Sequence, residues 1–402
     1  MSLTISSPKW ESFYAERTKW IKSSIIRELL KFTQQPDVIS FGGGLPAPEL
    51  FPIEAIKKAS SELLEKEGQM MLQYGPTEGY PLLNKEIVRY MDKMGVKCTP
   101  EEVLPTTGSQ QALDLVGKIF INEGDVIFVS KPTYLGALQA FNSYGPEYIG
   151  SLMDDDGLIP EDVEQVLKKR HPKFMYVIST FHNPAGVTMP EDRRKKLIEL
   201  AVKYDTIIIE DDPYSRLRFE GNDIPPLAAY SRERVIYLGT FSKVLAPGFR
   251  LGWIVAPKEV ITKLVHAKQG TDLHTSTYVQ YLAARLCEQN IIDPHLEKVR
   301  VVYRRRRDLM VESMEKYFPG EGFHWTRPQG GLFLWVTMPE RIDSVELLEK
   351  AVENKVAFVP GNAFYADPEE GKNTMRLNFS NMKEELIVEG IKRLGELLRR
   401  EM

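Results

Sequence analysis

The chain has 402 residues, of which 43% are hydrophobic and 27% are charged. This length is typical of two packed domains, and the composition excludes a disordered, collagen-like or coiled-coil protein. The 52 Lys and Arg residues nearly balance the 56 Asp and Glu residues, for a net charge of −4. This balance argues against a nucleic acid as the main partner.

Cys98 and Cys287 are the only cysteines, and neither has a second Cys or a His at ligand spacing. A disulfide framework and a bound metal are therefore not expected, and a reducing cytoplasm fits this usage. The longest stretch without Asp, Glu, Lys or Arg, residues 174–190, contains polar residues, two prolines and a glycine. No membrane span is predicted.

The apolar pattern begins with residues 25–34, which predict an amphipathic helix. Short apolar runs of strand length follow further along the chain, without the alternation of a half-exposed strand. These runs are residues 126–130, 174–180, 206–210, 235–240 and 251–256. Helical patterns such as residues 191–204 lie between several of them, which predicts βαβ units. The fold class expected is α/β, with a mostly parallel central sheet flanked by helices.

Beyond residue 290 the pattern changes to that of a smaller α+β unit. The expected elements are a charged helix at 294–317, a strand at 332–338, a helix at 344–354 and strands at 356–359 and 374–379. We therefore expect an N-terminal arm and part of the small domain at 1–50, a large domain at 51–295 and a small domain at 296–402. The run Arg304–Arg307 points in four directions on a helix, so it predicts a solvated or domain-interface surface rather than a nucleic-acid patch.

The segment GTFSKVLAPGFRLGW, residues 239–253, follows an expected strand. Its Thr240, Ser242 and Arg250 can bind a phosphate, and open α/β sheets bind ligands where their strands end. Lys243 lies among them, and a desolvated lysine can bond to a carbonyl cofactor. Taken alone, the segment also fits an ordinary surface lysine.

Two more strand ends carry polar side chains. EDDPYSRL, residues 210–217, follows a buried strand and contains Asp211 and Tyr214. FHNPAGVTMP, residues 181–190, follows another strand and places Asn183 in a rigid turn. The carboxyl ends of parallel strands meet at one edge, so these groups are expected to lie close together.

The order Asn-Pro-x-Gly, Asp-x-x-Tyr and Ser-Lys-x-x-x-Pro-Gly-x-Arg resembles the fold-type I pyridoxal-phosphate enzymes, and among them the class I/II aminotransferases. The chain is most similar to the subgroup of 2-aminoadipate and kynurenine aminotransferases. Further blocks of the family are ISFGGGLPAPELFP (39–52), QYGPTEGYPLL (73–83), TTGSQQALDL (106–115), PTYLGALQAF (132–141) and MRLNFS (375–380). The resemblance implies pyridoxal 5′-phosphate as the cofactor, bound by the large domain.

The resemblance also implies roles for residues around that cofactor. Lys243 matches its covalent attachment point, and Asp211 matches the partner of its ring nitrogen. Tyr214 and Asn183 match the residues bonded to its 3-oxygen. A carboxylate that keeps the ring protonated makes it a better electron sink. These four residues are therefore expected at the centre of the site.

Other matches surround this centre. Ser109, the backbone of Gln110, Thr240, Ser242 and Arg250 match the phosphate site, where a helix N-terminus favours an anion. By the same resemblance, Tyr134 matches the aromatic residue that stacks on the cofactor ring, and Arg376 matches the arginine that binds the substrate α-carboxylate. Gly43 and Gly44 match the loop that closes over the substrate.

Two further residues concern assembly and substrate range. Tyr74 matches a tyrosine that reaches the cofactor phosphate of a partner subunit, so the resemblance implies a homodimer with shared sites. Arg27, on the helix at 25–34, is a candidate for binding the distal carboxylate of glutamate or 2-aminoadipate, and a solvated arginine is the alternative. His182 is expected to be structural rather than a catalytic base.

The function expected is transfer of an amino group from an amino acid (2-aminoadipate, aromatic, branched-chain or similar) to a 2-oxo acid such as 2-oxoglutarate, by a ping-pong mechanism. Fold does not fix function, so a carbon–sulfur β-lyase on the same fold is an alternative. A more remote alternative is the aminotransferase-like ligand sensor of a transcription regulator. Because the family blocks begin by residue 39, little chain is left for a DNA-binding module ahead of them.

Overall fold

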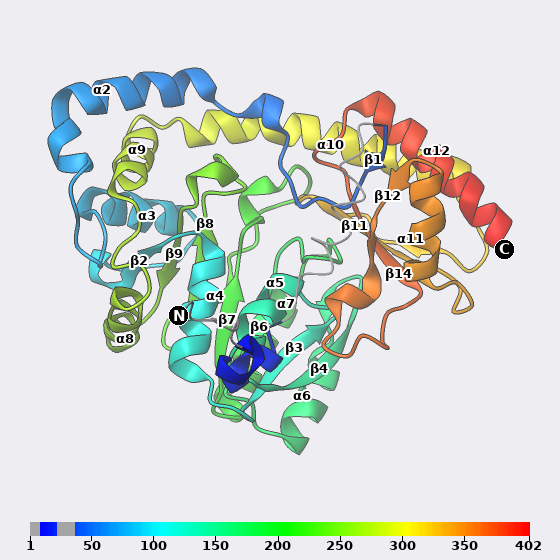
Figure 1. Cartoon of the computed structure of the whole chain (residues 1–402), viewed down its shortest axis with the longest axis horizontal. Helices are drawn as coiled ribbons and strands as arrows, with labels where there is room; N and C mark the ends of the chain where they lie inside the picture. Colours follow the sequence, from blue (N-terminus) through cyan, green and yellow to red (C-terminus); the bar gives the residue numbers. More distant parts are fainter. Residues whose placement is uncertain (1–8, 22–36) are drawn as a thin grey trace, which may run out of the picture.

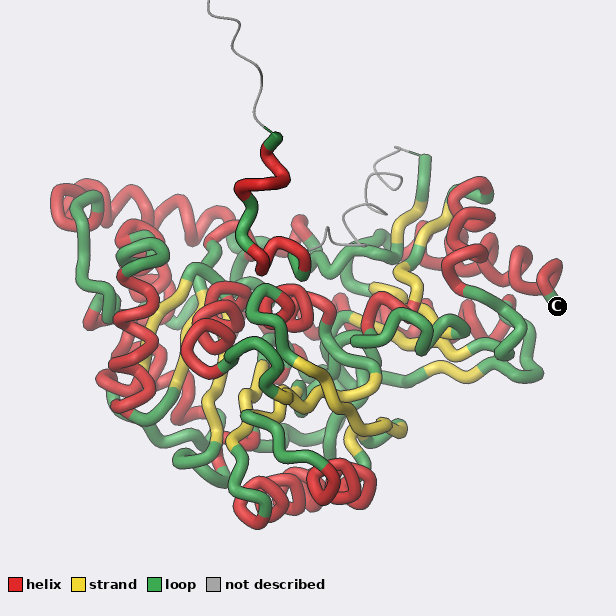
Figure 2. Tube along the Cα trace, turned by 60° about the horizontal axis from the view of Figure 1, so that its bottom comes forward, coloured by secondary structure: helices red, strands yellow, loops and turns green. Residues whose placement is uncertain are grey.

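The computed structural model describes residues 9–21 and 37–402 (Figure 1). Its centre is an eight-stranded sheet with helices packed on both sides (Figure 2). The strands, in spatial order, are β2 (Val103–Thr106), β9 (Gly252–Val255), β8 (Val235–Thr240), β7 (Ile207–Asp211), β6 (Phe174–Val177), β3 (Val126–Lys131), β4 (Glu147–Asp154) and β5 (Gly157–Leu158). The pairs from β8 to β4 are all parallel, which confirms the expected α/β class.

Both faces of the inner strands are buried, which explains why β3, β6, β7, β8 and β9 are apolar without alternation. On one face, the core includes residues of α4 (Ser109–Phe120), α5 (Leu135–Asn142) and α8 (Lys258–Gln269). The other face packs against a second set of helices. These are α2 (Ile53–Met71), α3 (Pro81–Lys93), α6 (Pro160–Lys169), α7 (Glu191–Lys203) and α9 (Thr277–Glu288).

The strand expected at residues 251–256 is present as β9, but it does not belong to a βαβ unit. It runs antiparallel to both β8 and β2. A parallel crossover needs a connection of a dozen or more residues, usually a helix, whereas the segment 241–251 holds only a short 3-10 helix, Pro247–Phe249. The chain therefore turns back beside β8, and the loop within this turn carries Lys243.

The C-terminal part begins with the long helix α10 (Ile292–Tyr317). An antiparallel four-stranded sheet follows, in the order β10 (His324–Trp325), β11 (Phe333–Thr337), β14 (Thr374–Asn378) and β13 (Val359–Pro360). The helices α11 (Ser344–Glu353) and α12 (Glu384–Glu401) belong to the same part. Near the start of the described chain, β1 (Ile39–Ser40) pairs in parallel with β12 (Val356–Ala357). We propose to keep the domain division at 1–50, 51–295 and 296–402, in which the boundary at 295 lies in the first turn of α10.

The arginine run on α10 lies partly inside the protein. Arg306 is 5% exposed and donates to the carbonyl of Ser380 and to Glu49. Arg307 is 8% exposed and binds the carbonyl of Pro328 and the Glu220 carboxylate. Both side chains therefore hold segments of the protein together, whereas Arg304 and Arg305 are exposed, so the run includes both a solvated part and an interface part. Within residues 9–21 and 37–402, no helix is long and apolar enough to cross a membrane, and no cluster of His, Cys, Asp and Glu could hold a metal.

A buried arginine fixes the loops that lead from β6 toward the ligand edge of the sheet. Arg194, on α7, is fully buried and donates to the backbone carbonyls of Met189, Ser179 and Pro225. It also donates to the hydroxyl of Thr180, at 2.8 Å. Buried carbonyls need such partners, so this single side chain stabilises three segments at once.

We expect Arg194→Met to lower the free energy of unfolding by about 3 kcal/mol or more, because several buried acceptors lose their donor together. The matched control is Lys195→Met, which removes an exposed ion pair with Glu191 and a cation–π contact with Tyr230, and should cost about 1 kcal/mol or less. Urea unfolding followed by circular dichroism measures both. Equal stability of the two variants would contradict the role given to Arg194.

Candidate active site

A hollow of about 360 Å³ lies at the carboxyl edge of the parallel strands. Loops after β6, β7 and β8 reach it, together with the start of α4, the N-terminal segment and the small domain. Most residues that the sequence singled out line it: Gly44, Ser109, Gln110, Tyr134, Asn183, Asp211, Tyr214, Thr240, Ser242, Lys243, Arg250 and Arg376. The hollow is therefore the candidate active site.

Asp211, the last residue of β7, is 2% exposed. Its Oδ2 accepts a hydrogen bond from the Tyr176 hydroxyl at 2.8 Å. Its Oδ1 is buried and has no hydrogen-bond partner among the residues that the structure describes. Burial raises the pKa of Asp211 to about 7. The carboxyl group can therefore accept one more donor, preferably a cationic one.

Tyr176 was missed in the sequence because it belongs to the apolar strand β6. Its contact with Asp211 depends on the pairing of β6 with β7, in which Tyr176 lies beside Ile209, two residues before Asp211. Side chains two residues apart on a strand point to the same face. A tyrosine in a buried strand next to a strand that ends in Asp is the signal that could have found it.

Lys243 lies on the loop that follows β8, and its Nζ donates to the carbonyl of Gly44 at 2.6 Å. Burial, and to a smaller extent the nearby Arg376 and Arg250 guanidinium groups, together lower the pKa of Lys243 to about 8. A larger fraction of this amine is consequently neutral at physiological pH than for an ordinary lysine. A neutral amine is the form that acts as a nucleophile or a base.

The start of α4 and the loop after β8 form a cradle suited to an anion. Gly108 precedes α4 with φ +77°, and a Cβ there would lie 2.5 Å from the Arg250 guanidinium. Thr240 Oγ1 lies 3.0 Å from Ser242 Oγ, which also accepts from Arg250 Nη1 at 3.4 Å. Backbone amides at a helix start, hydroxyl groups and a guanidinium are groups that bind phosphate.

Arg376, in the middle of β14, brings the small domain into the site. Its Nη1 donates to Asn183 Oδ1 at 2.9 Å and its Nη2 to the carbonyl of Gly42 at 2.7 Å. The guanidinium lies over the rings of Phe333 and Phe364, at 4.2 and 4.9 Å from their centroids. Burial lowers the pKa of Arg376 to about 10, so it remains a cation at neutral pH. A buried cation of this geometry can bind a carboxylate through two parallel hydrogen bonds.

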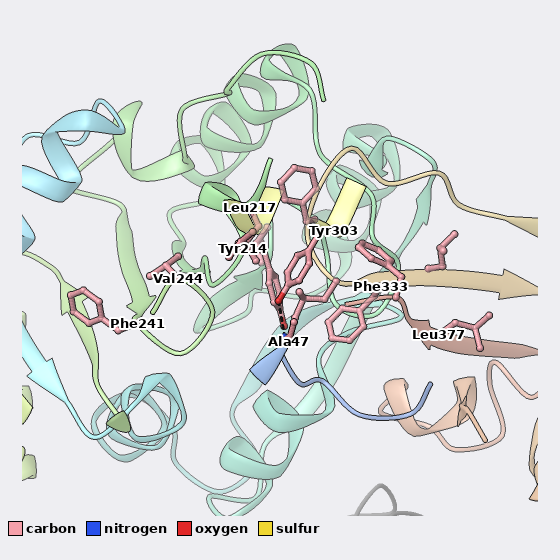
Figure 3. Packing of buried hydrophobic residues seen from close by; sticks show 14 of the residues in the cluster. Ala47, Tyr214, Leu217, Phe241, Val244, Tyr303, Phe333 and Leu377 are labelled. Atoms are coloured by element: carbon pink, nitrogen blue, oxygen red, sulfur yellow. Dashed lines mark hydrogen bonds between the residues drawn. The ribbon is translucent and has the colours of Figure 1, made fainter. Parts of the chain in front are cut away.

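Asn183 and Tyr214 form the remaining side of the hollow. Asn183 Nδ2 donates to the Tyr214 hydroxyl at 3.2 Å, and the Tyr214 ring meets Phe333 edge-on at 5.8 Å. Figure 3 shows these two aromatic rings beside Tyr303, whose hydroxyl accepts from the amide of Ala47 at 3.0 Å. That bond holds the N-terminal segment, which contributes Gly44, against α10.

Gly43 and Tyr74, two of the predicted residues that the structure describes, do not line the hollow. Gly43 is next to Gly44, and a Cβ added to it would contact the Leu45 side chain. Tyr74 is 80% exposed and packs its ring against His274. Arg27 lies outside the described residues. His182 is buried outside the hollow, with Nε2 3.0 Å from Ser130 Oγ, and burial lowers its pKa to about 3, so it is neutral.

These residues fit pyridoxal 5′-phosphate on chemical grounds. Asp211 Oδ1 offers an acceptor for a protonated ring nitrogen, Lys243 offers an amine of lowered pKa, and the cradle at Gly108 accepts a phosphate. Tyr134, at the start of α5, supplies an aromatic ring to the same hollow. The ring nitrogen, the carbonyl group and the phosphate of the cofactor thus each have a matching partner.

Comparison with known proteins agrees with this chemistry. The profile of the family described as aminotransferase class I and II matches residues 36–394. An aromatic-amino-acid aminotransferase from Thermococcus litoralis is 49% identical over 400 residues, which cover 98% of this chain and 95% of that protein.

Solved structures are similar over nearly the whole chain. The Pyrococcus horikoshii kynurenine aminotransferase matches with a TM-score of 0.94 and 46% identity, covering 98% of both chains. An alpha-aminoadipate aminotransferase from Thermus thermophilus, complexed with N-(5′-phosphopyridoxyl)-L-leucine, matches with a TM-score of 0.91 and 40% identity, covering 98% of this chain and 99% of that one.

In the cofactor-free protein, we expect Asp211→Asn to gain stability relative to the wild type as the pH rises. The pKa of Asp211 is about 7 in the folded chain against an ordinary value of 3.8, so unfolding releases a proton between these pH values. The wild-type carboxyl therefore destabilises the fold increasingly from pH 3.8 to about 7, whereas the amide does not titrate.

Urea unfolding of the cofactor-free proteins at pH 5 and pH 8 measures this difference. Asp156→Asn, at an exposed position, is the matched control and should show no such trend. A difference between Asp211→Asn and wild type that stays constant with pH would contradict the raised pKa.

Proposed function

The chain belongs to the class I and II aminotransferases, and we propose that Lys243, Asp211 and Arg376 are the residues through which it carries out transamination. Pyridoxal 5′-phosphate is its cofactor. The observation that carries the proposal is the meeting of an unpartnered Asp211 oxygen, a Lys243 amine of lowered pKa and a buried Arg376 in one hollow. Few other chemistries need all three groups together.

When bound, the cofactor carries the amino group and takes up electrons from the substrate Cα–H bond. In the proposal, Lys243 holds the cofactor covalently between turnovers and its freed Nζ moves the Cα proton. Asp211 keeps the ring nitrogen protonated through Oδ1, while Tyr176 steadies Oδ2. Tyr214 and Asn183 would bind the 3-oxygen.

The other residues bind and orient charged groups. We propose that Ser109, the backbone of Gln110, Thr240, Ser242 and Arg250 hold the phosphate, and that Tyr134 stacks on the ring. Arg376 then binds the substrate α-carboxylate, and Gly43 with Gly44 belongs to the segment covering it. The contact of Lys243 with the Gly44 carbonyl supports this placement, because it brings that segment to within hydrogen-bond distance of the reacting amine.

The names of the similar proteins guide the substrate proposal. We propose aromatic amino acids, kynurenine and 2-aminoadipate as donors, and 2-oxoglutarate as the acceptor in a ping-pong cycle through one pocket. Arg27 stays a candidate for binding a distal carboxylate. Spectra of the half-reaction with each donor alone would rank these substrates.

We expect Lys243→Ala to fold, to lose the yellow absorbance of the attached cofactor and to lose turnover by roughly 10²–10⁴-fold or more, because both the attachment point and the proton carrier are gone. The matched control, Lys258→Ala, removes an exposed lysine on α8 and should keep wild-type activity. Absorbance spectra and an assay with 2-oxoglutarate measure both properties.

Wild-type turnover by Lys243→Ala would remove this lysine from the proposal. The same assay tests the β-lyase alternative. Release of ammonia and pyruvate from a cysteine conjugate, without any 2-oxo acid acceptor, would favour elimination over transamination.

We further propose a homodimer in which Tyr74 serves the partner subunit's site. Tyr74 does not line the hollow of its own chain and is 80% exposed. Met70 and Leu72, just before it, are each 68% exposed. Such a group of exposed apolar side chains is typical of a protein–protein interface. The exposure of Tyr74 therefore fits a contact made in trans.

Mixing inactive variants tests this sharing. Subunits with Lys243→Ala and subunits with Tyr74→Ala are combined after partial unfolding and reassembly. If the sites are shared, each mixed dimer has one site with an intact Lys243 and an intact Tyr74, and random mixing restores about a quarter of wild-type activity. A tagged wild-type chain confirms that the subunits exchange. If they exchange and the activity equals the average of the two parent variants, Tyr74 serves its own chain.

A further inference from the structure

A second hollow, of about 370 Å³, lies on the loop that follows η5 (Ser215–Leu217), beside the end of α3. It shares no lining residue with the candidate active site. Four basic side chains line it: Lys93, Arg216, Arg218 and Arg300. A neighbouring hollow of about 450 Å³ shares Arg218 and Arg300 with it and adds Arg304.

Arg218 is buried at this place, with only 4% of its side chain exposed. Its Nη1 donates to Gln329 Oε1 at 3.0 Å and to the carbonyl of Glu220 at 3.3 Å. Its Nη2 is buried and has no acceptor within the described part of the chain. The guanidinium also lies over the Phe181 ring, 4.7 Å from the centroid. A buried guanidinium nitrogen without an acceptor is unfavourable, so an acceptor supplied from outside would stabilise it.

Arg216 repeats this arrangement two residues earlier. Its Nη2 donates to Asp293 Oδ1 at 2.7 Å, whereas its buried Nη1 has no acceptor in residues 9–21 and 37–402. The guanidinium lies 5.0 Å from the centroid of the Tyr90 ring. The Phe181 and Tyr90 rings therefore hold the guanidinium groups of Arg218 and Arg216 in place, but they do not accept hydrogen bonds from the unpartnered nitrogens.

The acidic groups nearby do not balance this charge. Asp293 already accepts from both Lys93 and Arg216, each at 2.7 Å. Asp223 lines the hollow but is 84% exposed, and its Oδ1 stays 3.7 Å from Arg218 Nε. Four cations therefore face two carboxylates, one of which is largely hydrated. An excess of positive charge next to unpartnered donors attracts anions.

We propose that this hollow is a binding site for a small oxoanion, a phosphate or carboxylate group, held by Arg216, Arg218 and Arg300. The forked donors of arginine match both groups. The site is separate from transamination and does not depend on the function proposed above. Its ligand would join two parts of the chain, because Arg300 belongs to α10 and donates to the Arg216 carbonyl at 2.8 Å.

The test is isothermal titration of inorganic phosphate into the cofactor-loaded enzyme, in which the cofactor occupies its own phosphate site, at constant ionic strength. The variants are Arg218→Gln, Arg305→Gln and Arg376→Lys. Arg305 is the matched control, since it lies on α10 with 71% of its side chain exposed and pairs with Glu384. Arg376→Lys reports on phosphate bound at the candidate substrate site. A second arm replaces phosphate with malonate.

We expect saturable binding of one phosphate per chain in wild type, Arg305→Gln and Arg376→Lys, and at least tenfold weaker binding of phosphate in Arg218→Gln. The preferred anion identifies the ligand as a phosphate or a carboxylate. If Arg218→Gln does not fold, Arg300→Gln, at a half-buried position, should weaken binding at least threefold. Absence of saturable binding with both anions, binding lost only in Arg376→Lys, or equal affinity in wild type and in the folded variant at position 218 or 300 would overturn the proposal.

Discussion

The candidate active site depends on the Asp211 carboxyl group, which is buried without a cationic partner among the described residues. Asp211 ends a central strand, receives one hydrogen bond from Tyr176 and keeps its other oxygen unpartnered. Lys243, on the loop after the neighbouring strand, is also desolvated, so the two pKa values approach each other at about 7 and about 8. The protein alone therefore leaves both groups incompletely stabilised. A ligand with a ring N–H for Asp211 and an anionic group for Lys243 would stabilise both side chains, and its binding would then raise the stability of this sheet edge.

Much of this edge could be predicted, because parallel strands bring their carboxyl ends together. Asn183, Asp211 and Lys243 each follow an apolar run, and the run marks the strand. Tyr176 could not be found in this way, since its contact with Asp211 depends on the register between two strands. The antiparallel direction of β9 could not be predicted either, because an apolar run indicates a strand without indicating its polarity.

The side chains under Arg376 show a second limit. Phe333 and Phe364 come from the small domain, far in sequence from Asn183, and no local pattern relates them. The guanidinium also bonds to Asn183 and to the Gly42 carbonyl, so three distant segments meet at one side chain. Such a meeting point depends on tertiary packing, which short patterns do not encode. The candidate anion site has the same origin, because Arg216 and Arg300 become neighbours only when α10 packs on the loop after β7.

The helix α10 has a mechanical consequence for substrate binding. Its 26 residues form a rod about 39 Å long, at 1.5 Å per residue, that begins in the large domain and ends in the small one. A pivot of only about 3° at its first turn displaces the far end by ~2 Å. That displacement is comparable to the 2.9 Å hydrogen-bond distance between Arg376 Nη1 and Asn183 Oδ1. A tilt of this helix would therefore change the distance between Arg376 and the rest of the hollow, so that a mutation at the base of the helix would alter the hollow from far away.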